Sequence, residues 1–188
     1  MEPRLAVPAE VTVRLASVDD AGALAEFAAR TFRVTFGPDS RPEDMDEYVA
    51  RAFGESVQRA ELSDHRCDVL LMETASHHLV GYAQLLVAEP PTRIAPSPAM
   101  ELQRFYVDRP FHGLGLAQRL MRESLGRAIE RGADLLWLGV WEHNARAISF
   151  YRKLGFMDAG SQSFILGTDR QTDRIMYRTT RDKARSGR

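Results

Sequence analysis

The segment that decides the fold is 100–117, MELQRFYVDRPFHGLGLA. Its first eight residues are mostly apolar or aromatic, which predicts a strand over 100–107. From Leu116 to Ile129, apolar residues recur at helical spacing, which predicts an amphipathic helix. Gly113 and Gly115 stand in the connection. The predicted strand therefore passes into the predicted helix through a turn that contains two glycines.

This glycine turn has the properties of an anion site. The first turn of a helix carries unpaired N–H groups and a partial positive charge. Glycine lets the chain bend sharply and lets a phosphate approach the backbone without a Cβ in the way. An ordinary strand-to-helix turn explains the same residues, so this segment alone leaves both interpretations open. A dinucleotide fingerprint is excluded by Gln118, and the Gly-Lys-Ser/Thr ending of a P-loop is missing.

A second pattern lies in 144–156, NARAISFYRKLGF. Asn144 and Tyr151 are seven residues apart, so they share one face of a predicted helix, with Ile148 between them. A capping asparagine and a core tyrosine would by themselves account for this helix. The glycine turn about 30 residues upstream favours a functional interpretation.

The rest of the chain predicts a mixed sheet with helices on its faces. Residues 11–180 form one domain, between a loose N-terminal segment (1–10) and a basic C-terminal tail (181–188). The predicted order is strand 11–15, helices 21–36, 42–53 and 56–61, strands 68–73, 79–87 and 100–107, helix 116–129, strand 135–141, helix 144–154, and strands 163–166 and 174–178.

Composition excludes several classes of protein. The 188 residues carry a formal charge of -1, which argues against a nucleic-acid-binding protein. No apolar run approaches the ~18 residues of a membrane span, and the N-terminus lacks the pattern of a secretory signal. A single cysteine, Cys67, suits a reducing compartment. We therefore expect a cytoplasmic α/β protein that binds neither nucleic acid nor membrane.

Both patterns resemble the two signatures of the GNAT acetyltransferase superfamily. His112, Gly115 and Ala117 stand where that family has Gln/Arg-x-x-Gly-x-Gly/Ala, although histidine replaces the usual first residue. The second pattern is similar to Asn-x-x-Ala…Tyr-x-Lys-x-Gly-Phe, nearly residue for residue. The resemblance implies an α/β (α+β) GNAT fold, with a mixed, mostly antiparallel sheet of six to seven strands flanked by helices on both faces.

The resemblance also implies a cosubstrate and its binding residues. The cosubstrate is acetyl-CoA, no metal is expected, and the oligomeric state stays open between monomer and homodimer. Asn144 is expected to contact the pantetheine arm, and Tyr151 to lie beside the sulfur as general acid or hydrogen-bond donor. The remaining cofactor-binding residues implied are Phe105, Tyr106, Val107, His112, Gly113, Leu114, Gly115, Leu116 and Ala117.

The acceptor is less well defined. Stretches around 31–36, 42–48, 137–144, 160–167 and 171–173 are similar to bacterial polyamine acetyltransferases of the PaiA kind, which implies spermidine or spermine. Eight acidic residues against three arginines between Asp39 and Asp64 would attract a polycation, but a solvated helix face is the simpler explanation of the same charges. Acetylation of a protein N-terminus, a lysine or another small amine, and a silent CoA-binding sensor, remain alternatives.

The reaction needs a base, because an aliphatic amine is mostly protonated at neutral pH. Glu101 is the candidate, since several GNAT enzymes carry such a group on the fourth strand; a solvent-facing carboxylate is the alternative. Cys67 could accept the acetyl group covalently, but a buried structural cysteine is the simpler interpretation. The sequence therefore predicts direct transfer in a ternary complex, with Tyr151 and Glu101 as the catalytic residues.

Overall fold

The structure is a computed structural model that describes residues 10–181. Apart from Glu10 and Arg181, the predicted N-terminal segment and basic tail lie outside the described residues. In chain order the elements are β1 (Val11–Leu15), α1 (Ala21–Phe36), α2 (Pro42–Ala52), α3 (Glu55–Ser63), β2 (Cys67–Thr74), β3 (Leu79–Val87), β4 (Ala99–Val107), α4 (Leu116–Glu130), β5 (Leu135–Trp141), α5 (Ala145–Lys153), β6 (Met157–Leu166) and β7 (Asp169–Thr179).

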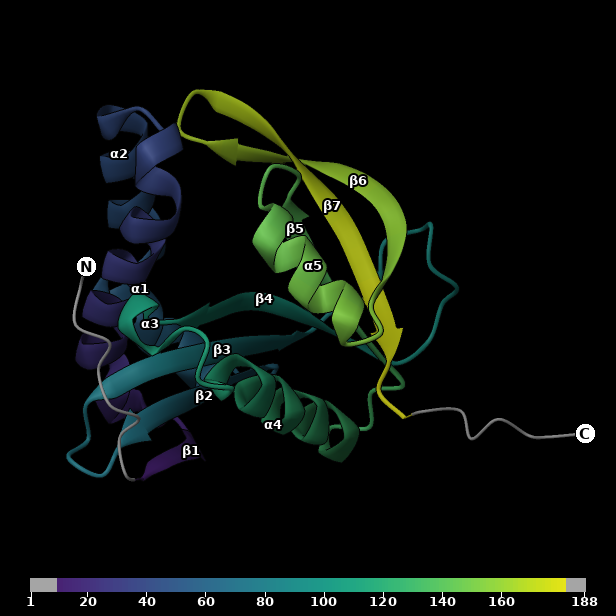
Figure 1. The fold of residues 1–188 in the computed structure, drawn as a ribbon, viewed down its shortest axis with the longest axis horizontal. Coiled ribbons are helices and arrows are strands. Elements are labelled where there is room, and N and C mark those ends of the chain that lie inside the picture. The colour runs from purple at the N-terminus through teal and green to yellow at the C-terminus, as the bar shows by residue number, and fades with distance from the viewer. Residues whose placement is uncertain (1–9, 182–188) are drawn as a thin grey trace, which may run out of the picture.

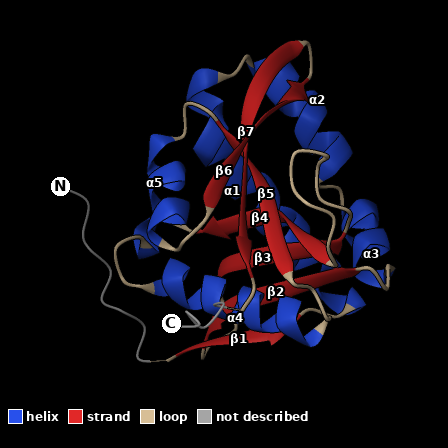
Figure 2. Ribbon diagram, turned by 90° about the vertical axis from the view of Figure 1, so that its right-hand side faces the viewer, coloured by secondary structure: helices blue, strands red, loops and turns tan. Residues whose placement is uncertain are grey.

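The strands form one seven-stranded sheet in the order β1-β2-β3-β4-β5-β7-β6. Every neighbouring pair is antiparallel except β4 and β5, which run parallel. Helices α4 and α5 cover one face, and α1, α2 and α3 cover the other (Figures 1 and 2). The expected mixed, mostly antiparallel sheet with helices on both faces is confirmed.

The sheet opens in its middle. Strands β4 and β5 pair only from Ala99↔Leu135 to Glu101↔Trp137, and beyond these pairs they diverge. On the other side of β4, Leu102 pairs with Leu85 and Arg104 with Gln84, so Gln103 forms a bulge. The bulge re-aims the rest of β4, and a wedge opens between 102–107 and 138–141 (Figure 1).

Each face of the sheet buries its own apolar cluster. Leu120 and Met121 of α4 pack with Met100 and Leu136 of the sheet, in agreement with the apolar stripe of α4. On the opposite face the α1 residues Leu24, Phe27, Ala28 and Phe32 pack with Val69, Leu71 and Tyr82 of the sheet. The two clusters fix the helices on either side of the wedge.

The last two strands are longer than the sequence predicted. Strand β6 covers Met157–Leu166 rather than 163–166, and β7 covers Asp169–Thr179 rather than 174–178. Much of β6 is exposed, and the first half of β7 is polar, so the apolar alternation that marks a half-buried strand is missing. The polar residues Gln171 and Asp173 line the wedge instead of the core.

Candidate active site

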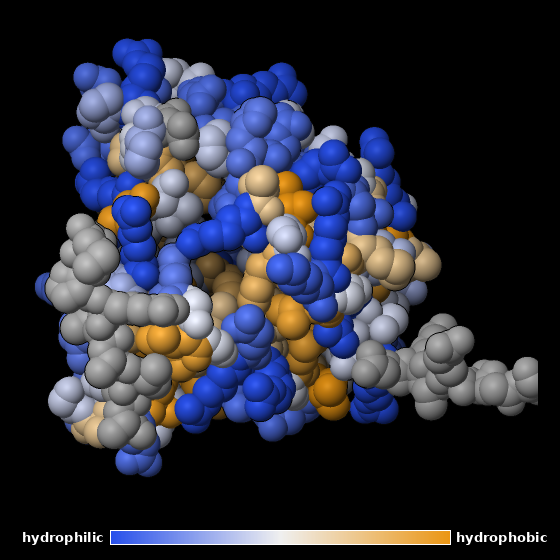
Figure 3. Space-filling view, in the orientation of Figure 1, coloured by the Kyte–Doolittle hydropathy of each residue, from blue (hydrophilic) through white to orange (hydrophobic). Residues whose placement is uncertain are grey.

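The wedge between β4 and β5 is a cleft of about 660 Å³. Its mouth is visible in Figure 3 as a hollow with apolar residues inside and hydrophilic residues at the rim. Two groups of lining residues differ in kind. The turn half consists of the end of β4, the glycine turn and α5; the aromatic half consists of α1, α2, the end of β5 and the β6–β7 hairpin.

The glycine turn adopts the backbone that its sequence predicts. Gly113 and Gly115 have φ values of 80° and 79°, in the left-handed region that favours glycine. Gly115 is the N-cap of α4, and nothing lies within 4 Å of the place where a Cβ would stand. The start of α4 is therefore open at Gly115, and this turn, which we call the cradle, fits the pyrophosphate of CoA.

The structure brings together nearly all of the predicted cofactor-binding residues. All of them line the cleft except Leu114, whose side chain packs on the hydrophobic core. The residues that line it are Phe105, Tyr106, Val107, His112, Gly113, Gly115, Leu116, Ala117, Asn144 and Tyr151.

Both ring nitrogens of His112 have hydrogen-bond partners. Its Nε2 lies 2.6 Å from the carbonyl oxygen of Val107, and its Nδ1 lies 2.7 Å from a guanidinium nitrogen of Arg146. A carbonyl only accepts and a guanidinium only donates, so His112 is the neutral tautomer with its proton on Nε2. Burial lowers the pKa of His112, which agrees with a neutral ring. The histidine thus holds Arg146 beside the glycine turn.

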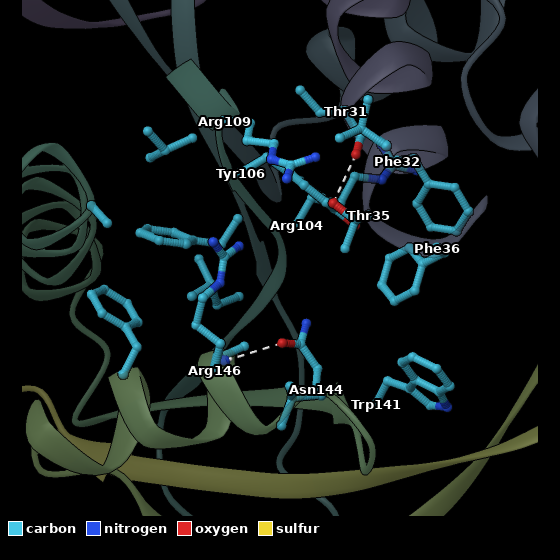
Figure 4. Close-up of a pocket in the computed structure, with 18 of the residues that line it drawn as sticks. Thr31, Phe32, Thr35, Phe36, Arg104, Tyr106, Arg109, Trp141, Asn144 and Arg146 are labelled. Atoms are coloured by element: carbon cyan, nitrogen blue, oxygen red, sulfur yellow. Dashed lines mark hydrogen bonds between the residues drawn. The ribbon is translucent and has the colours of Figure 1, made fainter. Parts of the chain in front are cut away.

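Helix α5 supplies the other residues of the turn half. The Oδ1 of Asn144 accepts the N–H of Ala147 and caps the helix, which leaves the Nδ2 donors of this side chain for other partners (Figure 4). Tyr151 is buried, and its ring lies 6.4 Å from that of Phe105. Burial raises the pKa of Tyr151 well above 10, so the phenol stays protonated at neutral pH.

The aromatic half was not predicted as part of the site. The rings of Phe32 and Tyr48 stack at 4.8 Å, and Phe164 meets Tyr48 edge-on at 5.7 Å. Phe36 of α1 lies 6.0 Å from Trp141 of β5, and both rings border the cleft (Figure 4). The helical spacing of apolar residues in α1 predicts that they pack in the core. It does not predict that some of them border a cleft.

Most charges around the aromatic half are neutralised. Arg104 donates to Glu61 at 2.6 Å and to Gln84 at 2.8 Å. The carboxylate of Asp108 accepts from Arg30 at 2.9 Å. Within residues 10–181 no ion pair or side-chain hydrogen bond engages the other carboxylate of the cleft, Asp173. Burial raises the pKa of Asp173 to about 6.

The structure does not bring Glu101 to the cleft. Glu101 pairs with Leu86 on one side and Trp137 on the other, at the closed end of the wedge, and it is absent from the lining. Burial raises its pKa, and a hydrogen bond with Gln103, which does line the cleft, opposes that shift. The sequence placed it on the correct strand, whereas the opening begins one residue later, at Leu102.

Cys67, the alternative acetyl acceptor, lies away from the cleft. Burial raises the pKa of the Cys67 thiol to about 12, and Cys67 lies outside the lining, so it is no nucleophile for this cleft.

The acidic residues of 39–64 largely form ion pairs. These pairs are Glu43 and Asp44 with Arg41, Asp46 with Arg33, Glu55 with Arg59, Glu61 with Arg104, and Asp64 with Arg66.

The aromatic half is held together by a contact between distant parts of the chain. Asp44 of α2 accepts the N–H of Thr168 at 2.7 Å and its hydroxyl at 3.0 Å. Gly167, at φ 59°, leaves no room for a Cβ, which would lie 2.2 Å from an oxygen of Asp44. Helix α2 and the tip of the β6–β7 hairpin are therefore fixed to each other.

Comparison with known proteins agrees with this geometry. Residues 24–156 match the acetyltransferase (GNAT) family. The chain belongs to this family. As a GNAT N-acetyltransferase it uses acetyl-CoA as cosubstrate. No group of metal-ligating side chains is found in the described part of this enzyme, and none of its described helices is long and apolar enough to cross a membrane.

Relatives are similar over most of their length. An uncharacterized N-acetyltransferase of Lactobacillus delbrueckii is 31% identical over 81% of this chain and 90% of its own. Another from Mycobacterium tuberculosis is 35% identical over 85% and 97%. The fold is similar to that of the PaiA N-acetyltransferase of Thermoplasma acidophilum in complex with coenzyme A, with a TM-score of 0.72, 20% identity, and coverage of 90% and 99%.

Proposed function

We propose that this enzyme transfers acetyl from acetyl-CoA to a primary amine by direct attack in a ternary complex. The observation that carries the proposal is one continuous cleft with a phosphate cradle in its turn half, an aromatic pocket with a carboxylate in the other half, and a protonated tyrosine on its lining. Both substrates can occupy such a cleft at once, so no covalent enzyme intermediate is needed.

The turn half binds the cosubstrate. The N–H groups at the start of α4 donate hydrogen bonds to the pyrophosphate, and Arg146, held by His112, adds a fixed positive charge. The edge of β4 beyond Glu101 has no strand partner toward the cleft among residues 10–181, and it offers backbone groups to the pantetheine arm. The Nδ2 of Asn144 donates to the same arm.

Tyr151 serves the leaving group. When the amine attacks the thioester, the C–S bond breaks and negative charge develops on sulfur. A buried phenol that stays protonated donates a hydrogen bond or a proton to that sulfur. Tyr151 is therefore the proposed general acid.

Among primary amines, a polyamine such as spermidine is the acceptor that we propose first. Its support is the sequence similarity to PaiA-type enzymes and the structural similarity to a PaiA N-acetyltransferase. The acidic residues of 39–64 add little, because most of them are paired with arginines. Acetylation of a protein N-terminus, a lysine or another small amine is the same reaction with a different acceptor.

Release of free thiol from acetyl-CoA tests the proposal. The purified chain is assayed with spermidine, spermine, butylamine, lysine and an alanine-initiated peptide. We expect CoA release with at least one primary amine and the fastest release with spermidine. Acetyl-CoA binding without release for any amine would leave only the sensor alternative.

A further inference from the structure

Asp173 lies at the inner end of the cleft. Its Oδ2 is 3.1 Å from the position that a Cβ on Gly139 would take, and Gly139 is the second residue of β5 after the last pair with β4. The missing side chain at 139 leaves room for this carboxylate beside the point where the sheet opens. Asp173 therefore reaches the part of the cleft where the two strands separate.

Aromatic residues are neighbours of Asp173 in the sheet. Trp141 of β5 lies directly opposite Asp173 in the sheet register. Gln162 of β6 is its other cross-strand neighbour, and Phe164 is diagonal to it on the same face. Tyr48 of α2 is also near, because the Asp173 charge contributes to the raised pKa of Tyr48. Aromatic faces and a carboxylate are the groups that bind an alkylammonium ion.

The charges that face this pocket leave Asp173 available. Two cations act on Tyr48 in this pocket, Arg104 of β4 and Arg51 of α2. Arg104 is neutralised by Glu61, and the guanidinium of Arg51 lies 5.7 Å from the centre of the Tyr48 ring. Tyr48 is a neutral phenol whose pKa is raised chiefly by burial, and Gln162 carries no charge. The carboxylate is thus half-buried without a countercharge from the described residues, which is costly unless a cationic ligand supplies one.

We propose that Asp173 binds the ammonium group of the acceptor between Trp141, Tyr48 and Phe164, and then accepts its proton. This inference rests on the proposed function and names its acceptor subsite and base. The base predicted on β4, Glu101, is thereby replaced by a residue of β7. The subsite accepts one cationic end, so a polyamine enters by one terminal ammonium and a monoamine can enter in the same way.

The step balances in protons and electrons. The ammonium gives one proton to the Asp173 carboxylate and becomes a neutral amine. The nitrogen lone pair forms the C–N bond, the C–S bond breaks, and the thiolate takes the proton of Tyr151. The second proton lost by nitrogen restores the phenol through solvent, and the Asp173 carboxylic acid returns its proton to solvent. The products are the acetamide, the free thiol of CoA and one proton.

The isosteric variant Asp173→Asn tests this assignment. We expect kcat/KM for the amine to fall by ~100-fold, which is the usual effect of losing a general base. The fall of wild-type kcat/KM below about pH 6, where Asp173 is protonated, should disappear in the variant. The Kd for acetyl-CoA, measured by calorimetry, should stay within about twofold of wild type, because Asp173 is remote from the phosphate cradle. Wild-type kcat/KM with a wild-type pH profile would overturn the proposal.

Two matched carboxylates serve as controls. Asp169→Asn changes an exposed residue at the start of the same strand, outside the cleft lining, and should leave kcat/KM unchanged. Glu101→Gln compares the base predicted on β4 with Asp173; a large loss there with none in Asp173→Asn would overturn the proposal and return the base to β4.

A binding readout separates failure of this inference from failure of the proposed function. Butylammonium is titrated into the wild type and Asp173→Asn, each saturated with CoA, and followed by NMR shifts of the tryptophan side chains. Binding to the wild type alone supports the subsite even if no amine is acetylated. Equal binding to both proteins, or binding to neither, overturns it.

Discussion

The two halves of the cleft are built from different parts of the chain. The turn half uses backbone: an opened strand edge, the N–H groups of a glycine turn, and a helix whose cap is Asn144. The aromatic half uses side chains from α1, α2, β5, β6 and β7, which begin more than a hundred residues apart. A backbone site tolerates many sequences, whereas a side-chain site depends on each residue, so the second half is where acceptor choice can vary.

Tyr151→Phe tests the chemistry where the two halves meet. We expect kcat to fall by ~100-fold, because the leaving thiolate loses its proton donor. The Kd for acetyl-CoA should change little, since the ring and its packing on Phe105 remain. Steady-state kinetics with calorimetry provides both values, and an unchanged kcat would remove Tyr151 from the mechanism.

Gly115→Val breaks the turn half alone. The new side chain projects into the phosphate cradle and forces a β-branched residue into the left-handed region, at a cost of about 1–2 kcal/mol. We expect the KM for acetyl-CoA to rise by ~30-fold and the KM for the amine to stay near its wild-type value. Gly126→Val, within α4 and also with open space at its Cβ, is the matched control. Equal effects of both variants would contradict the cradle.

Arg146→Gln tests whether the turn half, which binds mostly through backbone groups, also depends on a side chain. We expect the KM for acetyl-CoA to rise by ~10-fold, the effect of about 1.4 kcal/mol from one charge-assisted contact. Arg122→Gln, on an exposed site of α4, should have no such effect.

The same contact predicts a dependence on pH. The folded state lowers the pKa of His112, so its preference for the neutral ring stabilises the protein above the unfolded pKa and is lost as pH falls through the folded value. Protonation puts a hydrogen on Nδ1 and breaks its contact with Arg146. The KM for acetyl-CoA should therefore rise toward acid pH, and a His112→Gln variant should show a smaller rise.

Asp173→Asn is expected to stabilise the fold by a small amount, although it lowers the activity. The folded state raises the pKa of Asp173 from 3.8 to about 6, so its ionised form destabilises the fold above pH 6 and the effect vanishes below pH 3.8. Two pKa units correspond to about 3 kcal/mol, and partial solvent exposure reduces this to about 1–2 kcal/mol. The variant should melt at a higher temperature than wild type at pH 7.5 and at the same temperature near pH 4; a lower Tm at pH 7.5 would contradict the buried charge.

The sequence predicted the elements whose pattern is local. The glycine turn, the helix from Asn144 to Leu154 and the strands before them could be placed because hydrophobic period, caps and glycines mark them within a few residues. The full extent of β6 and β7 could not be predicted, because a strand that lines a polar cleft loses the alternation of a half-buried strand.

The acceptor side could not be predicted for a different reason. Glu101 and Gln103 stand on the same strand, and only the register with β5 shows that the cleft opens after Glu101. Asp173 gains its environment from Trp141 and Gln162, partners set by strand order rather than by spacing. The coupling of His112 to Arg146 likewise needed the three-dimensional contact.

The contact between Asp44 and Thr168 has a consequence for biosynthesis. The ribosome makes the chain from its N-terminus, and by Phe156 it has made every residue of the glycine turn and of α5. The β6–β7 hairpin, which carries Phe164 and Asp173, is made after that. Thr168, the partner of Asp44, lies 124 residues after it in the chain. The part of the chain that completes the aromatic half is therefore made last, and the contact between α2 and the hairpin can form only after Thr168 has been added.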